Sequence, residues 1–112
     1  MSDCIFCKMI EKKMPCKIEH EDDDLIAIRD IHPQAPAHLL VIPKKHVASV
    51  SDLKETDRDL IGQVLIGAKN IAQKKGWKHY RLVLNNGEEA GQSVFHIHCH
   101  LLSGRPMLWP PG

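Results

Sequence analysis

Residues 94–102 have the sequence VFHIHCHLL, in which histidines and apolar residues alternate. Successive side chains of a β-strand point to opposite faces, so this alternation predicts a strand over 94–102. One face of that strand would belong to the core, and its residues are Phe95, Ile97, Cys99 and Leu101. The other face would carry a row of three imidazoles, from His96, His98 and His100. Imidazole acts as a base, a nucleophile or a metal ligand near neutral pH, so this face predicts a chemical site.

The remaining elements can be predicted outward from this strand. A long amphipathic helix is expected over 57–75, with Thr56 as its N-cap and Gly76 just after its end. A short helix is expected over 5–12, ended by Pro15. Further strands are expected over 17–23, 25–30, 38–42 and 80–84, and loops over 32–36 and 85–93. Several strand connections are too short for a crossover, so the predicted fold is α+β, with a largely antiparallel five-stranded sheet, one long helix and one short helix.

Length and composition narrow the class of protein. The chain has 112 residues, of which 43% are hydrophobic and 26% charged, and these values predict one globular domain over residues 1–112. A formal net charge of +1 argues against nucleic-acid binding through bulk charge. No apolar run approaches the ~20 residues that span a bilayer, and the N-terminal stretch does not resemble a signal peptide. We therefore expect a cytoplasmic protein with neither a nucleic-acid nor a membrane partner.

The polar loop just before the histidines predicts an anion site. It supplies Gly87, Gly91 and Ser93 within a few residues of the three imidazoles. Glycine lets backbone N–H groups approach an anion closely, and a serine hydroxyl adds a further donor. An ordinary glycine-rich turn would explain the loop if it stood alone. Next to three imidazoles, a cradle for phosphate is the better interpretation.

The sequence resembles the histidine-triad family along almost its whole length. HIHCHLL matches the pattern His-φ-His-φ-His-φ-φ, in which φ is apolar. The segments IFCKMI, RDIHPQAPAHLLVIPKKH, LVLNNG, GQSVFHIHCHLL and GRPMLWPPG occur in the order seen in the Hint branch, the nucleoside phosphoramidate hydrolases. The triad alone is fairly specific, and its combination with the proline-rich segment and the terminal WPPG is highly specific.

The resemblance implies a hydrolase that cleaves P–N bonds of purine nucleoside 5′-phosphoramidates through a covalent nucleotidyl-histidine. His98 would be the nucleophile, with its other ring nitrogen donating to a backbone carbonyl. His100 would contact the phosphate, and His38 and Ser93 would complete the catalytic group. The chain would form a homodimer that shares its C-terminal segment.

The same resemblance implies a set of nucleotide-binding residues. Asp30 would accept hydrogen bonds from the ribose hydroxyls, and the phosphate and leaving group would be held by polar residues of the loop. The implied phosphate ligands are Asn85, Gly91, Gln92 and Ser93. The implied apolar wall around the base is Ile5, Phe6, Ile28, Ile31 and Leu40, residues that would serve equally well as plain core.

The pair Cys4-x-x-Cys7 provides two thiols on one turn, which is half of a tetrahedral zinc site. The residues alone do not identify the other two ligands, and they are also consistent with a redox dithiol or with unligated thiols. Some histidine-triad proteins complete such a site with the histidine after the PKK segment and the first triad histidine. The resemblance therefore implies structural zinc held by Cys4, Cys7, His46 and His96, with no metal required for catalysis. Cys16 has no visible partner and is expected to be a free thiol.

Three other functions compete with the phosphoramidase. A sister branch hydrolyses dinucleoside polyphosphates, although the terminal GRPMLWPPG favours the Hint branch. A nucleotide-binding regulatory protein with incidental catalysis would use the same pocket. The three histidines could also form a catalytic metal centre that activates water.

Overall fold

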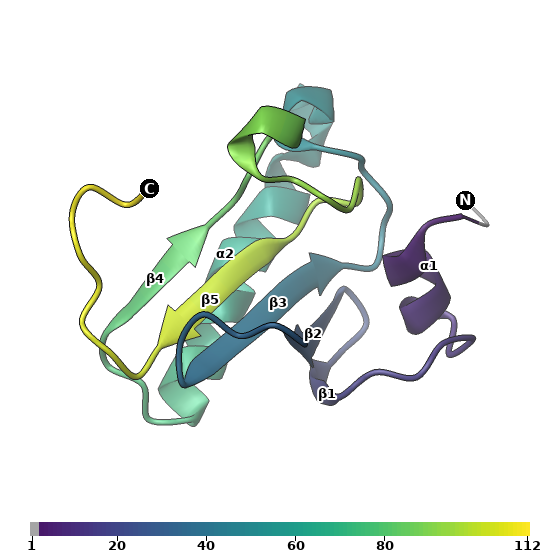
Figure 1. The fold of residues 1–112 in the computed structure, drawn as a ribbon. Coiled ribbons are helices and arrows are strands. Elements are labelled where there is room, and N and C mark those ends of the chain that lie inside the picture. The colour runs from purple at the N-terminus through teal and green to yellow at the C-terminus, as the bar shows by residue number, and fades with distance from the viewer. Residues whose placement is uncertain (1–2) are drawn as a thin grey trace.

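The computed structural model describes residues 3–112, and its helices and strands are labelled in Figure 1. The helices within these residues are α1 (Ile5–Ile10) and α2 (Arg58–Lys74). The strands are β1 (Ile18–Glu21), β2 (Leu25–Arg29), β3 (Ala37–Pro43), β4 (Tyr80–Val83) and β5 (Cys99–Ser103). Short 3-10 turns lie at Val50–Asp52, Glu55–Asp57 and Glu88–Ala90.

The strands form one five-stranded sheet in the order β1-β2-β3-β5-β4. Every neighbouring pair is antiparallel, so the α+β class with its antiparallel sheet is confirmed. The last strand of the chain lies between β3 and β4, which places β5 inside the sheet and β4 at an edge. No helix within residues 3–112 is long and apolar enough to cross a membrane.

The sheet has one helix on each face (Figure 1). On the α2 face, Leu39 and Val41 of β3 pack with Cys99 and Leu101 of β5 against buried side chains of α2. On the other face, Phe6 of α1 packs with four buried aliphatic residues, which are Ile26, Ile28, Leu40 and Ile42. Alternation along β3 and β5 therefore sends one set of side chains to α2 and the other, including His38 and His100, to the α1 face. The prediction that Cys99 faces the core is confirmed.

Both predicted helices exist, with shorter bounds. The helix α2 begins at Arg58 after a 3-10 turn, so the N-cap is Asp57 and the prediction of Thr56 was wrong. The Asp57 carboxylate accepts hydrogen bonds from the Lys54 backbone N–H at 2.9 Å and from Lys45 Nζ at 3.0 Å, which fixes the turn. The helix α1 ends at Ile10, well before Pro15, because Lys12 adopts a left-handed backbone conformation with φ of 64°.

The predicted strand over 94–102 is wrong in its first half. The pairing of β5 begins at Cys99, opposite Val41 of β3, and residues 94–98 form no regular structure. Ile97 donates its backbone N–H to the carbonyl of Val47 at 2.7 Å, beyond the end of β3. Phe95 is 47% exposed instead of facing the core, whereas Ile97 is buried with Cys99 and Leu101 as the alternation predicted. The rings of His96 and His98 both pack edge-on against Phe6 of α1, and the His98 ring lies beside that of His100, so the three imidazoles remain on the α1 side.

Candidate active site and candidate metal site

Three imidazoles meet on the α1 face of the sheet. His38 is on β3 and His100 on β5, and the register pairs His38 with Leu102 and Leu40 with His100. This register makes His38 and His100 diagonal neighbours, and His38 Nε2 lies 2.9 Å from His100 Nδ1. The ring of His98, which precedes β5, lies 5.2 Å from the ring of His100 between centroids. The structure therefore brings together the three histidines that the sequence analysis assigned to catalysis.

Backbone groups decide which nitrogen of each ring carries the proton. His98 Nδ1 lies 2.7 Å from the carbonyl oxygen of His96, and a carbonyl only accepts, so Nδ1 carries the hydrogen and Nε2 is left unprotonated. This is the backbone contact that the sequence analysis expected for His98. The Gln34 backbone N–H donates to His38 Nδ1 at 3.0 Å, which puts the proton of His38 on Nε2, facing His100 Nδ1. His100 consequently carries its own proton on Nε2.

Burial keeps these rings neutral. Desolvation lowers the pKa of His98, against a smaller opposing effect from the hydrogen bond to the His96 carbonyl. Desolvation, with the nearby His98 and His38 rings, lowers the pKa of His100 to about 4. Burial also lowers the pKa of His38, although Asp30, whose Oδ2 lies 3.4 Å from His38 Nε2, opposes the shift. At neutral pH the site offers an unprotonated nitrogen on His98, the state that a nucleophile needs.

A cavity of about 710 Å³ opens beside these rings. Its lining includes the polar residues Asn85, Ser93, His98 and His100 together with many apolar side chains. The residues from the sequence analysis that line it are Ile5, Phe6, Ile28, Asp30, Ile31, Leu40, Asn85, Gly91, Ser93, His98 and His100. Its shape and lining are typical of a site for a small molecule with an apolar body and an anionic end.

The cavity also has lining residues that sequence reasoning did not assign to it. They are Met9, Pro15, Cys16, Lys17, Arg29, His32, Pro33 and Val94. Several of them lie between α1 and β1, where Pro15 was noted only as a helix stop. No spacing signal in this stretch identifies a cavity wall, because the wall forms only when the segment folds back beside β2. Cys16 is half-buried, and burial raises the pKa of its thiol.

The loop before the histidines is held in shape by a glycine and a glutamine. Gly91 has φ of 101°, and a Cβ there would lie 3.3 Å from Asn85 Nδ2, so both backbone and space favour glycine. Gln92 is not among the residues that line the cavity, and its role at the phosphate stays a prediction. Its side chain is buried and bonds to Gly87 N, Ala48 O and Val94 O. Its amide groups are thus engaged in bracing the loop.

A second cluster lies at the start of α1 and contains Cys4, Cys7, His46 and His96. Their ligand atoms all lie within 4.8 Å of one another. Cys4 is the N-cap of α1, His46 follows β3, and His96 lies in the irregular segment before β5. The fold thus gathers the four residues that the sequence resemblance named as metal ligands.

The donor set fits a tetrahedral zinc ion. With the usual Zn–S and Zn–N bond lengths, the edges of such a tetrahedron measure about 3.3–3.8 Å. Four of the six separations lie between 3.1 Å, from His46 Nδ1 to His96 Nδ1, and 3.6 Å, from Cys7 Sγ to His96 Nδ1, and all six are within 4.8 Å. His96 Nε2 donates to the Pro43 carbonyl at 2.7 Å, which leaves Nδ1 unprotonated, as ligation requires.

The pKa values of two of these residues bear on metal binding. Burial lowers the pKa of His96 to about 4, so its ring is neutral and able to coordinate. Burial, followed by the hydrogen bond and charge of Cys4, raises the pKa of Cys7 to about 11. A metal ion would therefore displace a thiol proton on binding, and its affinity would rise with pH.

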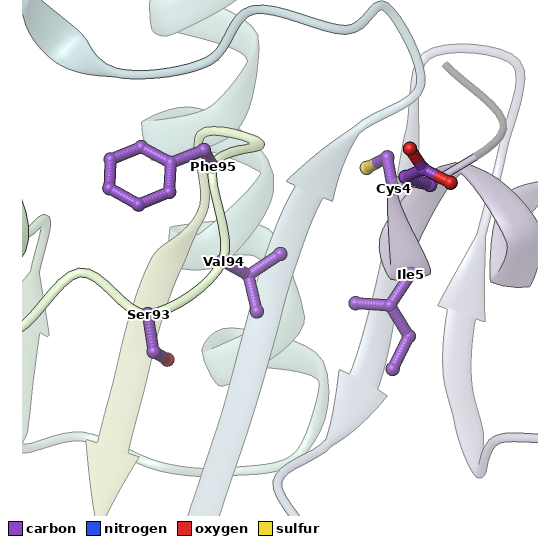
Figure 2. Close-up of a pocket in the computed structure, with 6 residues that line it drawn as sticks. Cys4, Ile5, Ser93, Val94 and Phe95 are labelled. Atoms are coloured by element: carbon purple, nitrogen blue, oxygen red, sulfur yellow. The ribbon is translucent and has the colours of Figure 1, made fainter.

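A shallower hollow of about 390 Å³ borders both sites. Figure 2 shows Cys4 and Ile5, at the start of α1, across from Ser93, Val94 and Phe95 of the segment before β5. Ile5, Ser93 and Val94 line this hollow and also the larger cavity. The candidate metal site and the candidate active site therefore share two segments of chain, the start of α1 and the segment before β5.

Comparison with known proteins defines the class. A family model described as "Scavenger mRNA decapping enzyme C-term binding" matches residues 3–109. An uncharacterised HIT-like protein of Synechocystis sp. is 48% identical over 111 residues, which cover 98% of this chain and 97% of that protein. The chain is a member of the family that this model describes, and it belongs to the histidine-triad (HIT) family.

Two solved structures sharpen the comparison. The crystal structure of a HIT family hydrolase from Legionella pneumophila is 49% identical, with a TM-score of 0.95 over 98% of this chain and 100% of that chain. A Zn-bound histidine-triad family protein from Mycobacterium smegmatis is 28% identical, with a TM-score of 0.82 over 93% of this chain and 76% of that one. The fold expected from the resemblance is therefore confirmed, and zinc is present in at least one relative.

Proposed function

We propose that this protein is a hydrolase that cleaves the P–N bond of purine nucleoside 5′-phosphoramidates, with His98 as the nucleophile. The observation that carries the proposal is the unprotonated Nε2 of His98, a residue that lines the large cavity together with Asn85, Ser93 and His100. A carbonyl fixes the proton on the opposite nitrogen, and burial keeps the ring neutral. Neighbouring structures named as HIT family hydrolases support hydrolysis as the reaction class.

Each part of such a substrate has a matching part of the cavity. The base would lie on the apolar wall that includes Phe6, Ile28 and Leu40. The Asp30 carboxylate would accept hydrogen bonds from the ribose hydroxyls, as its Oδ1 already does from the His32 backbone N–H at 2.8 Å. The phosphate would lie between His98 and the Nε2–H of His100, with Ser93 beside it. These donors would stabilise negative charge on the phosphate oxygens.

The proposed reaction has two displacements at one phosphorus. His98 Nε2 forms a bond to phosphorus while the P–N bond of the substrate breaks. The electron pair of the P–N bond goes to the substrate nitrogen, which takes a proton from water and leaves as the amine. The positive charge that develops on the His98 ring is stabilised by the His96 carbonyl at Nδ1. A second water attacks phosphorus, breaks the bond to Nε2 and loses a proton, so that the nucleoside monophosphate is released and the protons balance.

Zinc is proposed as a resident of the second cluster and not of the active site. Cys4, Cys7, His46 and His96 would hold it, and it would supply only a cross-link between α1, the loop after β3 and the segment before β5. The Zn-bound relative and the fit of the donor set support this assignment. It leaves His98 free for the reaction.

A homodimer is the proposed assembly. Leu108 and Trp109 in the C-terminal segment are 74% and 83% exposed, and a second chain would cover them. Arg81 of the edge strand β4 donates to the Leu108 carbonyl at 2.9 Å and holds that segment beside the sheet. Light scattering at micromolar concentration tests this point, and a monomeric mass would contradict it.

Steady-state hydrolysis of adenosine 5′-phosphoramidate by wild type and His98→Ala tests the function. EDTA is included to remove free divalent ions, and the zinc content of each protein is measured. We expect turnover by the wild type and a loss of about 10³-fold or more in the variant. Diadenosine polyphosphates and bare AMP are assayed in parallel. Hydrolysis of the polyphosphates alone would favour the sister activity, and tight AMP binding without turnover would favour a nucleotide sensor.

A further inference from the structure

We propose that metal bound by Cys4, Cys7, His46 and His96 also positions the nucleophile, with His96 as the positioning residue that connects the two sites. The inference rests on the proposed function for its kinetic consequence, but its structural part stands on contacts within the chain. It assigns the metal a role beyond fastening α1 to the sheet.

The first connection is the peptide unit between His96 and Ile97. Its carbonyl accepts the Nδ1–H of His98 at 2.7 Å, and this bond sets the His98 tautomer. Its N–H donates to the Val47 carbonyl at 2.7 Å. One candidate ligand, His96, belongs to this peptide unit, and another, His46, is the neighbour of Val47. A metal that joins His46 to His96 would therefore restrain both the His96–Ile97 peptide unit, which orients His98, and the Val47 carbonyl to which this peptide unit is bonded.

The polar contacts of the His96 ring within residues 3–112 are with the metal cluster and one carbonyl. It is fully buried, with Nε2 donating to the Pro43 carbonyl at 2.7 Å and Nδ1 3.4 Å from Cys4 Sγ. Residues 94–98 have no ladder pairing, so the sheet does not fix the backbone of His96. Without metal, Nδ1 would face two sulfurs and a second imidazole with no ion to join them, which is a weaker restraint than coordination.

The second connection runs through Phe6. This residue lies between Cys4 and Cys7 in the first turn of α1, and Cys7 N–H donates to Cys4 Sγ at 3.3 Å. The Phe6 ring packs edge-on against His98 at 5.0 Å and against His96 at 5.9 Å between centroids. Coordination by the two flanking sulfurs would fix the side chain that closes one side of the His98 ring.

The test compares zinc-loaded wild type, wild type stripped by a strong chelator, and the ligand variant His46→Ala. The ring centroids of His46 and His96 are 4.7 Å apart, and His46 is not part of the active site. An effect of this substitution on His98 would therefore be transmitted through the metal cluster. His20→Ala is the matched control, because His20 pairs with Asp22 on the β1–β2 turn, outside both sites. Zinc content, thermal melting and kcat and KM are measured for each protein.

The decisive readout is the His98 tautomer. Two-dimensional ¹H–¹⁵N spectra of protein labelled with ¹⁵N-histidine monitor it, and the signals of His98 are identified by their absence in His98→Ala. We expect the single Nδ1–H form in zinc-loaded wild type and in His20→Ala. In stripped wild type and His46→Ala, which remain folded, we expect a mixture of tautomers and a fall in kcat of about 10-fold or more with KM little changed. Zinc should restore the stripped wild type and not the variant.

Two results would overturn the proposal. In the first, the folded, metal-free proteins keep the Nδ1–H form and full kcat, in which case the metal only fastens α1. In the second, the His98 tautomer changes only when the whole chain unfolds, in which case the metal only stabilises the fold. If zinc-loaded wild type hydrolyses no phosphoramidate, the proposed function fails, and the spectra still decide whether the metal positions His98.

Discussion

His96 and His98 are two residues apart, are both buried, and serve two different sites. His96 donates from Nε2 to the Pro43 carbonyl and turns Nδ1 toward two sulfurs. His98 donates from Nδ1 to the His96 carbonyl and turns Nε2 toward the large cavity. The identity of the residue is the same in both places. The difference in chemistry comes from which ring nitrogen a backbone carbonyl engages, because that contact decides which nitrogen is left free.

The largest expected effect separates the two histidines by function. His98→Ala should lose about 10³-fold or more in phosphoramidate turnover while still binding one zinc per chain, because the removed ring touches no metal ligand atom. Turnover and zinc content of the same preparation measure both quantities. Loss of zinc from this variant would show that the two sites are not separable and would contradict the comparison.

The next effect concerns the metal cluster. Cys7→Ala should weaken zinc binding by about 100-fold or more, because a thiolate ligand is removed directly. Cys16→Ala is the matched control, since Cys16 is also a half-buried cysteine but belongs to the cavity wall. Competition with a coloured zinc chelator measures both affinities. Equal affinities in the two variants would remove Cys7 from the ligand set.

A smaller effect sharpens the cavity side of the comparison. Asp30→Asn should lower kcat/KM for a ribonucleoside phosphoramidate by roughly 10-fold, because hydrogen bonds to a charged acceptor are worth about 1.5–3 kcal/mol. The 2′,3′-dideoxy analogue, which has no hydroxyls to donate, should be affected much less. The ratio of kcat/KM for the two substrates is the measurement. An equal loss of kcat/KM on both substrates would indicate that Asp30 acts by orienting His38, whose Nε2 lies 3.4 Å from Asp30 Oδ2.

The smallest effect is expected from pH near neutrality. A free imidazole titrates near pH 6.5, but burial lowers the pKa of His98 and His38 and brings that of His100 to about 4. The rings therefore stay neutral, and kcat/KM should change less than about twofold between pH 7.5 and 6.5. Below pH 6.5 the unfolded chain binds protons that the folded chain excludes, so stability should fall toward about pH 4. A pH–rate profile and denaturation curves test this, and an acid limb centred at 6.5 would contradict it.

Much of this architecture could be predicted from the sequence. The spacing of apolar residues placed α2 within one residue at each end, and short strand connections predicted antiparallel pairing. Alternation on β3 and β5 correctly separated His38 and His100 from the core-facing Leu39 and Cys99. Local propensity and periodicity suffice where regular hydrogen bonding continues along the segment.

Prediction failed where a tertiary contact replaces regular pairing. The alternation of VFHIHCHLL continues through residues 94–98, yet Ile97 bonds to Val47 there and the ladder has ended. The Gln92 side chain is likewise held by tertiary contacts, since it bonds to Gly87, Ala48 and Val94. Neither contact leaves a signal in the neighbouring sequence.

The sequence by itself determined the family, the sheet, the long helix and the set of histidines and cysteines available for chemistry. The family resemblance named the two groups of residues, and the tertiary structure decided how the ring nitrogens of His96 and His98 are oriented within them. The physical reason is that a ring's role depends on the partner of each nitrogen. Those partners are the carbonyls of Pro43 and His96, whose positions are set by chain segments far from α1 in the sequence and by an irregular turn.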